Sequence, residues 1–389
     1  MNKKIYKIIL IVMFFMPTML IFIVPIRGEK EISRLESRKL EEIPDFSFSS
    51  FFDGSFQDKL EKSITDQMLL SQTIKVNIKK LKNSINTHVY SFLITNKKNC
   101  NGYIEVVDGY YSYNCSTYLI EKPVINYRDE VFESNKSIYN NIRADKYIYF
   151  IEKDRSINFD NIEEKNKWFE GIKKNFKAKK YAKFSLNSYN DLEEYFYQTD
   201  HHWNYKGSYK GYTEIIELLF GKKEKVLKPL KVEQFNVIFN GSASRKSLTN
   251  LSDERFAVFT FNIPSYKSYI NDKAKNYGSK ENYLNNNYKS DLYANHYSLY
   301  YGGDFAKVEY DFNNKNKENL LVLATSYSNA INDLIASHFN KTYVIDLRFY
   351  KEHYNQDLDI NKFIKNNNID KVLIMGDIYS FAKEDKNAL

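Results

Sequence analysis

The sequence predicts an α/β fold built on a parallel sheet. Two observations support this: several short apolar runs of the kind that form buried strands, and segments of helix length that separate them. The apolar runs are 146–151 (KYIYFI), 319–325 (NLLVLAT), 342–347 (TYVIDL) and 371–375 (KVLIM). Strands that alternate with helices form right-handed βαβ units, which place the strands parallel to one another.

The segments between these strands are expected to be helical. Residues 161–176 read as a polar helix, residues 330–339 carry apolar side chains on one face, and residues 358–367 precede the last strand. The stretch 225–300 is rich in Asn, Ser, Tyr and Lys, and we expect a long insertion there. The predicted α/β domain covers 98–389.

The N-terminal segment predicts a membrane anchor. Lys3, Lys4 and Lys7 precede an uncharged run at 8–26, which is close to the roughly 20 residues that span a bilayer. The lysines place the N-terminus in the cytoplasm and the rest of the chain outside the plasma membrane. The competing interpretation is a cleaved signal peptide, but its apolar run is usually shorter and no A-x-A-like site follows. We favour an uncleaved anchor within residues 1–27.

Residues 28–97 are predicted to connect the anchor to the α/β domain. The first part is a charged stalk that ends near Pro44, and an amphipathic helix is expected over 47–82. A β-hairpin that turns at Asp108-Gly109 then opens the domain. Cys100 and Cys115 flank this hairpin. An export compartment permits a disulfide between them, and two reduced thiols are the alternative.

Composition and motifs exclude several functions. The formal net charge is +8, but the lysines are scattered among nearly as many acids and form no nucleic-acid motif. The 13 Gly are dispersed, and no nucleotide-binding loop, zincin motif or GxSxG motif occurs. We therefore expect no nucleic acid, no cofactor and no metal. The 33 Tyr and 28 Phe suit sugar-facing surfaces, although an AT-rich genome produces the same surplus.

The segment 198–211 (QTDHHWNYKGSYKG) is the first candidate for chemistry. If it is extended, Asp200 and His202 face the same side, so the carboxylate can orient the imidazole as a base. His201 then points the opposite way, which argues against a metal site shared by the two histidines. Asn204 is a good cap for a helix that ends at Gly221. The alternative is a structural turn with Trp203 in the core.

A serine at the end of a predicted strand is the second candidate. Ser326 follows the apolar run 319–325 and precedes a helix, so it lies at the carboxyl end of a parallel strand, where sites in α/β proteins form. The amides of Ser326 and Tyr327 are positioned to stabilise an oxyanion. A Ser-rich stretch after a strand is more often only a helix cap, but with an Asp-x-His it completes a triad.

These segments resemble a known group. TDHHW and the later TSYS look like the DHHW protein family and the SGNH-hydrolase-like domain of the alginate O-acetyltransferases. Further segments also resemble the DHHW family: residues 36–54 with Asp66, 297–305 (YSLYYGGDF) and 344–350 (VIDLRFY). The resemblance covers nearly the whole exported chain. It implies a three-layer, flavodoxin-like SGNH fold with Ser326 as nucleophile, His202 as base and Asp200 as orienting acid.

The resemblance also implies a function. It points to an O-acetyltransferase that acetylates a surface polysaccharide and takes acetyl groups from a membrane-bound O-acyltransferase partner. Thr325 before the serine resembles the alginate enzymes, whereas the oxyanion Gly and the Asn of most SGNH enzymes are not identifiable. Five residues are expected to contact the oxyanion or the substrate: Tyr327, Trp203, Gly302, Gly303 and Arg348.

Two alternatives remain at this stage. The same triad would serve an acetylesterase if water replaced the sugar hydroxyl as acceptor. The fold would also serve a non-catalytic protein that binds cell-wall polysaccharide through tyrosine-rich surfaces. The anchor and the family resemblance favour acetyl transfer over both.

Overall fold

The computed structural model describes residues 32–33, 38–67, 101–107, 109–123, 128–247, 252–274 and 294–382, with scattered positions between 77 and 92. The predicted anchor at 8–26 lies outside these residues. No helix in the described part is long and apolar enough to cross a membrane. The chain divides into one unit of residues 1–89 with 245–249, and a second unit that comprises 90–244 and 250–389.

The described part of the first unit is mostly helical. A short antiparallel pair, β1 (Ile32–Ser33) and β2 (Arg38–Lys39), precedes α3 (Phe48–Phe52) and α4 (Ser55–Gln67). A single helix from residue 47 is therefore wrong, because Gly54 between the two helices has a φ of 83°, which does not continue an α-helix. Most of the expected helix beyond residue 67 lies outside the described residues.

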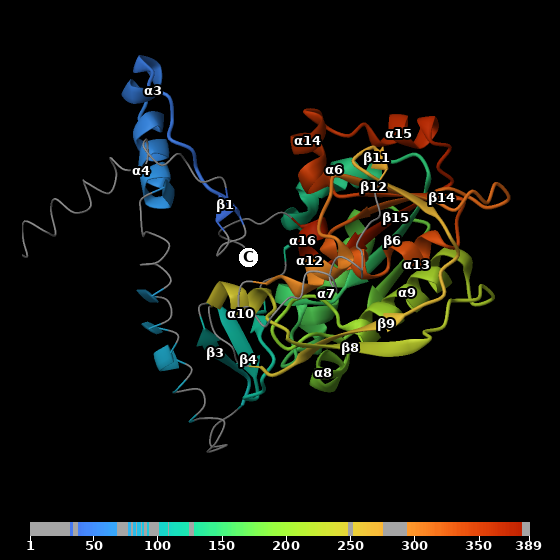
Figure 1. Cartoon of the computed structure of the whole chain (residues 1–389), viewed down its shortest axis with the longest axis horizontal. Coiled ribbons are helices and arrows are strands. Elements are labelled where there is room, and N and C mark those ends of the chain that lie inside the picture. The colour runs from blue at the N-terminus through green and yellow to red at the C-terminus, as the bar shows by residue number, and fades with distance from the viewer. Residues whose placement is uncertain are drawn as a thin grey trace, which may run out of the picture. The chain divides into compact units, whose positions relative to one another are not determined.

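An eight-stranded sheet forms the centre of the second unit (Figure 1). Across the sheet the strands are β11 (Lys273–Ala274), β10 (Lys267–Ile270), β12 (Lys307–Asp311), β14 (Lys341–Ile345), β13 (Leu320–Ala324), β15 (Lys371–Gly376), β6 (Asp145–Ile151) and β7 (Lys180–Phe184). The last five are parallel, which confirms the four predicted strands. A wholly parallel sheet is wrong, because β12, β10 and β11 extend it antiparallel at one edge.

The order of the parallel strands has a switch point at β13. If β13, β14 and β15 are counted first and β6 and β7 after them, the order across the sheet is 2-1-3-4-5. The strands that follow β13 lie on opposite sides of it, β14 on one and β15 on the other. In open α/β sheets, ligands bind beyond the carboxyl end of the strand at which the order switches. Residue 325 and its successors occupy this place.

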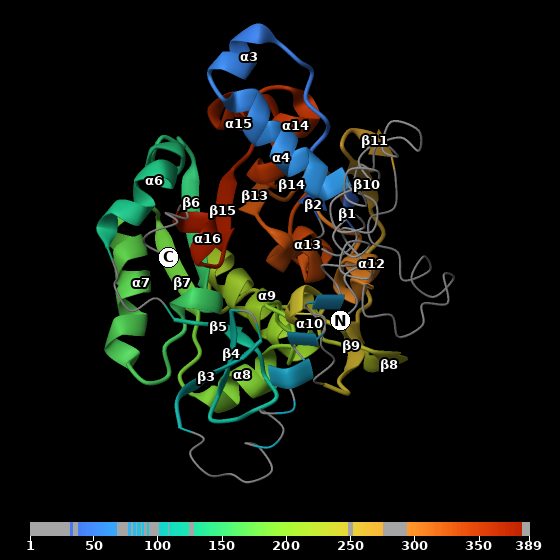
Figure 2. The ribbon, with the colours of Figure 1, turned by 90° about the vertical axis from the view of Figure 1, so that its left-hand side faces the viewer.

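Helices cover both faces of the sheet, so the unit has three layers (Figure 2). Alternate side chains of β6 pack on opposite faces of the sheet. Tyr149 packs in the hydrophobic cluster with α9 (Tyr205–Phe220) and α13 (Asn332–Ala336), and Phe150 packs in the cluster on the opposite face. The opposite face is covered by α6 (Glu133–Asn140), α7 (Ile162–Asn175), α14 (Leu347–Tyr354), α15 (Ile360–Asn366) and α16 (Ile378–Phe381). The expected helix over 330–339 is shorter and follows a 3-10 turn, η3 (Ser326–Ala330).

Smaller elements complete the second unit. The predicted hairpin is present as β3 (Tyr103–Val107) and β4 (Tyr110–Tyr113), with β5 (Ile120–Glu121) added. Cys115 is disulfide-bonded, but Cys100 lies outside the described residues, so the pairing stays a prediction. The other elements are η1 (Asp129–Phe132), η2 (Asp154–Ser156), α8 (Tyr189–Tyr195), the hairpin of β8 (Lys231–Ile238) and β9 (Arg255–Thr260), and α12 (His296–Tyr301). The helix α10 (Ser242–Ser247) begins in this unit, and its residues from 245 onward belong to the first unit.

Candidate active site

The histidine pair lies in a tight turn at the entrance to α9. A bridge between Phe196 and Trp203 closes the turn. Asn204 fixes it, because its side-chain oxygen caps the amides at the start of α9 and its side-chain nitrogen donates to the Phe196 carbonyl. The segment is therefore not extended, and the condition under which the side chains of 200–202 would alternate is not met. The predicted helix from Asn204 to Gly221 is confirmed.

Three residues from this turn and from the end of β13 form a continuous chain of hydrogen bonds. Ser326 Oγ lies 2.7 Å from His202 Nε2, and His202 Nδ1 lies 2.5 Å from Asp200 Oδ1. The His202 amide also donates to Asp200 Oδ1. Asp200 and His202 are buried, whereas Ser326 is half-buried. The structure thus brings together residues that are 124 positions apart, in the geometry of a nucleophile, a base and an orienting acid.

Asp200 is held by a second segment that sequence reasoning missed. The Ser242 amide donates to Asp200 Oδ2 over 2.6 Å, and the Gly241 amide donates to the Thr199 hydroxyl. A Cβ at Gly241 would lie 2.2 Å from the Thr199 carbonyl oxygen, so only glycine fits at this close approach. No residue-type signal marks these contacts, because they use backbone amides 42 residues away in the sequence.

Tyr297 is a further residue that the sequence did not single out for this role. Its ring stacks on the His202 imidazole, with centroids 3.9 Å apart and planes 10° apart. Its hydroxyl donates to the Ser326 carbonyl oxygen over 3.1 Å. The Tyr297 side chain is almost fully buried. It therefore positions the base and the serine together.

Two residues that were expected to contact the substrate have buried side chains instead. The Trp203 side chain is fully buried against Gly207 and Gly211 of α9, where it cannot reach a substrate. The Tyr327 side chain is also buried, and its hydroxyl donates to the His201 carbonyl over 2.7 Å. Both side chains support the turn that carries His202. The Tyr327 amide stays a predicted oxyanion donor.

Gly302, Gly303 and Arg348 lie at or near the carboxyl edge of the parallel strands. Gly302 ends α12 with a φ of 95°, and the Gly303 carbonyl accepts a hydrogen bond from Asn329. Arg348 follows β14 and makes a bidentate ion pair with Asp346, in which Nε donates to Oδ1 and Nη2 donates to Oδ2. These contacts give the three residues structural roles, and their part in substrate binding stays a prediction.

His201 does not point away from His202, as the extended geometry had predicted. The two imidazole centroids are 3.9 Å apart, and ligand atoms of Asp200, His201 and His202 lie within 4.8 Å of one another. A metal here would compete for nitrogens that already have partners. His201 Nδ1 bonds Ser242 Oγ over 2.8 Å, and both nitrogens of His202 belong to the hydrogen-bond chain. The arrangement suits proton transfer better than metal coordination.

One carboxyl beside the site holds its proton unusually tightly. Burial raises the pKa of Glu254 to about 8, and the nearby charge of Asp200 acts in the same direction. Its Oε2 accepts a hydrogen bond from the Gln198 amide, which partly opposes the shift. At neutral pH this carboxyl is therefore mostly neutral and adds little negative charge next to Asp200.

The chain matches no protein-family model and no curated protein. It does resemble solved structures. The structure of Bacillus cereus PatB1 aligns at 19% identity with a TM-score of 0.53, over 69% of this chain and 96% of that one. The chain shares its fold with PatB1.

A second PatB1 structure, with a sulfonyl adduct, aligns at 19% identity with a TM-score of 0.52, over 73% of this chain and 98% of PatB1. A DHHW family protein from Eubacterium siraeum aligns at 19% identity with a TM-score of 0.46, over 74% of this chain and 97% of its own. The alignments with PatB1 thus span nearly the whole of that structure.

Proposed function

We propose that the chain is an acyl-transfer enzyme of the SGNH type that moves acetyl groups to hydroxyls of a cell-surface or exported polysaccharide. The observation that carries the proposal is the hydrogen-bond chain Ser326–His202–Asp200 at the switch point of the sheet. The strand order 2-1-3-4-5 counted from β13 supports the flavodoxin-like form of the fold. The likeness to PatB1 supports the same assignment of the fold.

The residues account for both halves of the reaction. Ser326 Oγ attacks the acetyl carbonyl of the donor while His202 Nε2 accepts its proton, and Asp200 stabilises the imidazolium. The donor then leaves with that proton, and an acetyl ester remains on Ser326. A sugar hydroxyl next attacks this ester and gives its proton to His202. The acetylated sugar departs as the proton returns to Ser326. The amides of Ser326 and Tyr327 would stabilise the oxyanion.

The location of the enzyme and the source of its acetyl groups are inferred from the sequence and form part of the proposal. Residues 8–26 would anchor the chain in the plasma membrane, with the α/β domain on the outer side. A membrane-bound O-acyltransferase would then deliver acetyl groups across the membrane to Ser326.

Labelling of the serine tests the chemistry. The full chain in detergent is treated with phenylmethylsulfonyl fluoride and, separately, with p-nitrophenyl acetate. We expect a sulfonyl adduct on Ser326, and acetate release that Ser326→Ala lowers by about 10³-fold or more. Ser328→Ala is the matched control, because that hydroxyl already donates to the Thr325 carbonyl. Equal labelling and turnover in wild type and Ser326→Ala would contradict both enzymatic hypotheses, the acetyltransferase and the acetylesterase.

The acetyl content of the surface polymer tests the direction. A deletion strain is expected to lose O-acetyl groups, and the wild-type gene, but not the Ser326→Ala gene, is expected to restore them. A gain of acetyl groups in the deletion strain would identify an esterase instead.

A further inference from the structure

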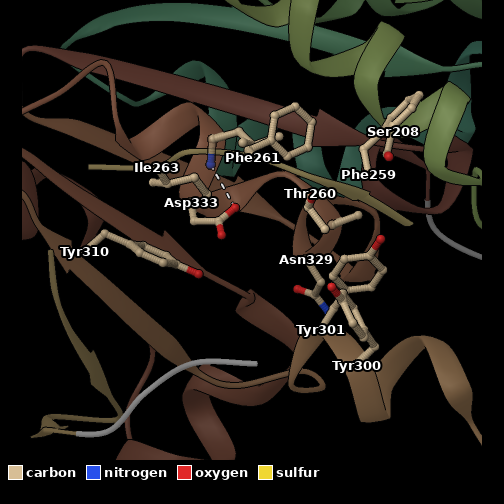
Figure 3. Close-up of a pocket in the computed structure, with 12 residues that line it drawn as sticks. Ser208, Phe259, Thr260, Phe261, Ile263, Tyr300, Tyr301, Tyr310, Asn329 and Asp333 are labelled. Carbon is tan, nitrogen blue, oxygen red and sulfur yellow. Dashed lines mark hydrogen bonds between the residues drawn. The ribbon is translucent and has the colours of Figure 1, made fainter. Parts of the chain in front are cut away.

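A cavity of about 310 Å³ lies near the hydrogen-bond chain, and Figure 3 shows the residues that line it. Tyr301 lines it, and the Tyr301 ring is 4.8 Å from Tyr297, which stacks on His202. Asn329 and Ala330 line it from η3, the turn that begins at Ser326. At about 30 Å³ for each water, the volume equals about ten waters, which is enough for one sugar ring. None of Asp200, His202 and Ser326 lines the cavity, which is connected to the proposed acyl-transfer centre through Tyr301 and Tyr297 and through η3.

One carboxylate, that of Asp333, lines the cavity. Asp333 Oδ1 accepts a hydrogen bond from the Leu334 amide over 2.9 Å. Among the residues that the structure describes, none forms an ion pair with Asp333. Burial raises its pKa to about 6, and backbone hydrogen bonds oppose the shift. At pH 7.5 the group is therefore mostly ionised, and no described residue pairs with its charge.

Aromatic rings form much of the wall around this charge. They are Phe259, Phe261, Tyr300, Tyr301 and Tyr310. In the view of Figure 3, Asp333 and Tyr310 lie on one side of the space, and Tyr300 and Tyr301 lie on the other. The faces of aromatic rings are electronegative, so a half-buried carboxylate among such rings attracts a cation. The same arrangement repels phosphate and carboxylate groups, because each would add a second negative charge to a desolvated site.

We propose that this cavity binds the ammonium group of an amino sugar in the acceptor polymer. Asp333 pairs with the ammonium group, and the rings contact the cation and the sugar face. The inference deepens the proposed function and rests on it, because the bound polymer is an acceptor only if the chain transfers acyl groups. It predicts a preference for polymers whose sugars carry free amines over fully N-acetylated ones.

Binding to the full chain tests the proposal without turnover. Calorimetry at pH 7.5 and low salt uses glucosamine, with glucose and N-acetylglucosamine as uncharged probes of the same ring and choline as a cation without a ring. We expect glucosamine to bind at least about tenfold more tightly than either uncharged sugar. Asp333→Asn keeps an oxygen that can accept from the Leu334 amide, and it should remove this difference. Phe261→Leu keeps apolar volume and should weaken glucosamine binding several-fold.

Controls separate this proposal from the catalytic one. Asp357→Asn removes an exposed acid that pairs with Lys351 outside the cavity, and it should bind glucosamine like wild type. Ser326→Ala should also bind like wild type, so a failed acyl-transfer assay leaves the binding result standing. Equal affinities for glucosamine and glucose, the absence of glucosamine binding, or choline binding without a preference for glucosamine over glucose would each overturn the proposal. Melting temperatures identify any variant that fails to fold.

Discussion

The Tyr297 ring lies parallel to the His202 imidazole at a centroid distance of 3.9 Å, and the hydroxyl of the same tyrosine donates to the carbonyl of Ser326. One side chain thus contacts both Ser326 and His202. Tyr297 belongs to α12, which connects the two residues although it is distant from both in the sequence. Its ring restricts rotation of the His202 imidazole, and its hydroxyl restricts movement of the backbone at the start of η3.

Two substitutions separate these contributions. Tyr297→Phe keeps the stacked ring and loses one hydrogen bond, so kcat/KM for p-nitrophenyl acetate should fall about two- to tenfold. Tyr297→Leu loses both contacts and should reduce kcat/KM more, by about tenfold or beyond, mainly through kcat. Steady-state kinetics of both variants measures the effect. If Tyr297→Leu matched wild type at an unchanged melting temperature, the positioning role would be wrong.

The backbone amide of Ser242 provides a second test, because it holds Asp200 from outside the histidine turn. Ser242 is the first residue of α10, where proline is tolerated, so Ser242→Pro removes the N–H without breaking the helix. A hydrogen bond to a charged group contributes about 1.5–3 kcal/mol, and we expect kcat/KM to fall by roughly ten- to hundredfold.

Ser242→Ala is the matched control for this prediction. It keeps the N–H to Asp200 and removes only the hydroxyl that contacts His201. Its kcat/KM should stay well above that of Ser242→Pro. Equal losses in the two variants would assign the effect to the hydroxyl and contradict the role of the amide.

Much of the fold was predictable because its central strands are continuous apolar runs. The runs that became β6, β13, β14 and β15 are buried on both faces, which is the pattern of a parallel sheet covered by helices. The antiparallel strands β10 and β11 are four and two residues long and lie in a polar, tyrosine-rich stretch. Edge strands of this length carry too little periodicity to be recognised in a single sequence.

The candidate site was predictable where its signal is local and residue-specific. Asp200, His202 and Ser326 are side chains of reactive types beside strand or helix boundaries, so their positions could be inferred. The contributions of Ser242 and Tyr297 depend on a backbone amide and on a stacked ring brought in by the tertiary fold. The orientation of His201 was mispredicted because the period-two rule for strands does not apply to a turn.

Packing between Trp203 and α9 yields a further prediction. A Cβ at Gly211 would lie 2.5 Å from the Trp203 ring, and the ring is surrounded by core residues that leave it no room to move. Gly211→Ala should therefore destabilise the protein by about 1–3 kcal/mol despite the better helix propensity of alanine. It should also lower kcat, because Trp203 directly follows His202. Thermal unfolding and turnover are measured together.

Glu217→Ala is the control on the same helix. Glu217 is exposed, so this substitution tests helix propensity without a clash. Its melting temperature should equal or slightly exceed that of wild type. A Gly211→Ala protein as stable as Glu217→Ala would show that the tryptophan can shift and that the close packing is not required.

The raised pKa of Glu254 predicts a pH dependence of stability. The folded value is about 8, against an ordinary value of 4.5, because burial and the charge of Asp200 both disfavour the carboxylate. Between these pH values the folded protein holds more protons on this group than the unfolded chain does, so stability falls as pH rises. One such proton changes the unfolding free energy by at most about 1.4 kcal/mol per pH unit. Because Glu254 is only half-buried, we expect a total loss of about 1–3 kcal/mol between pH 5 and 8.

Glu254→Gln removes this proton while keeping an oxygen that can accept from the Gln198 amide. Urea unfolding of wild type and variant at pH 5, 6, 7 and 8 should therefore give curves that diverge as pH rises, with the glutamine variant gaining relative stability. Asp253→Asn, at the exposed neighbouring position, should follow wild type over the same range. Parallel pH profiles for wild type and Glu254→Gln would mean that the carboxyl ionises at its ordinary pKa. The negative charge beside Asp200 would then be present throughout the neutral range, and the electrostatic description of the site would have to include it.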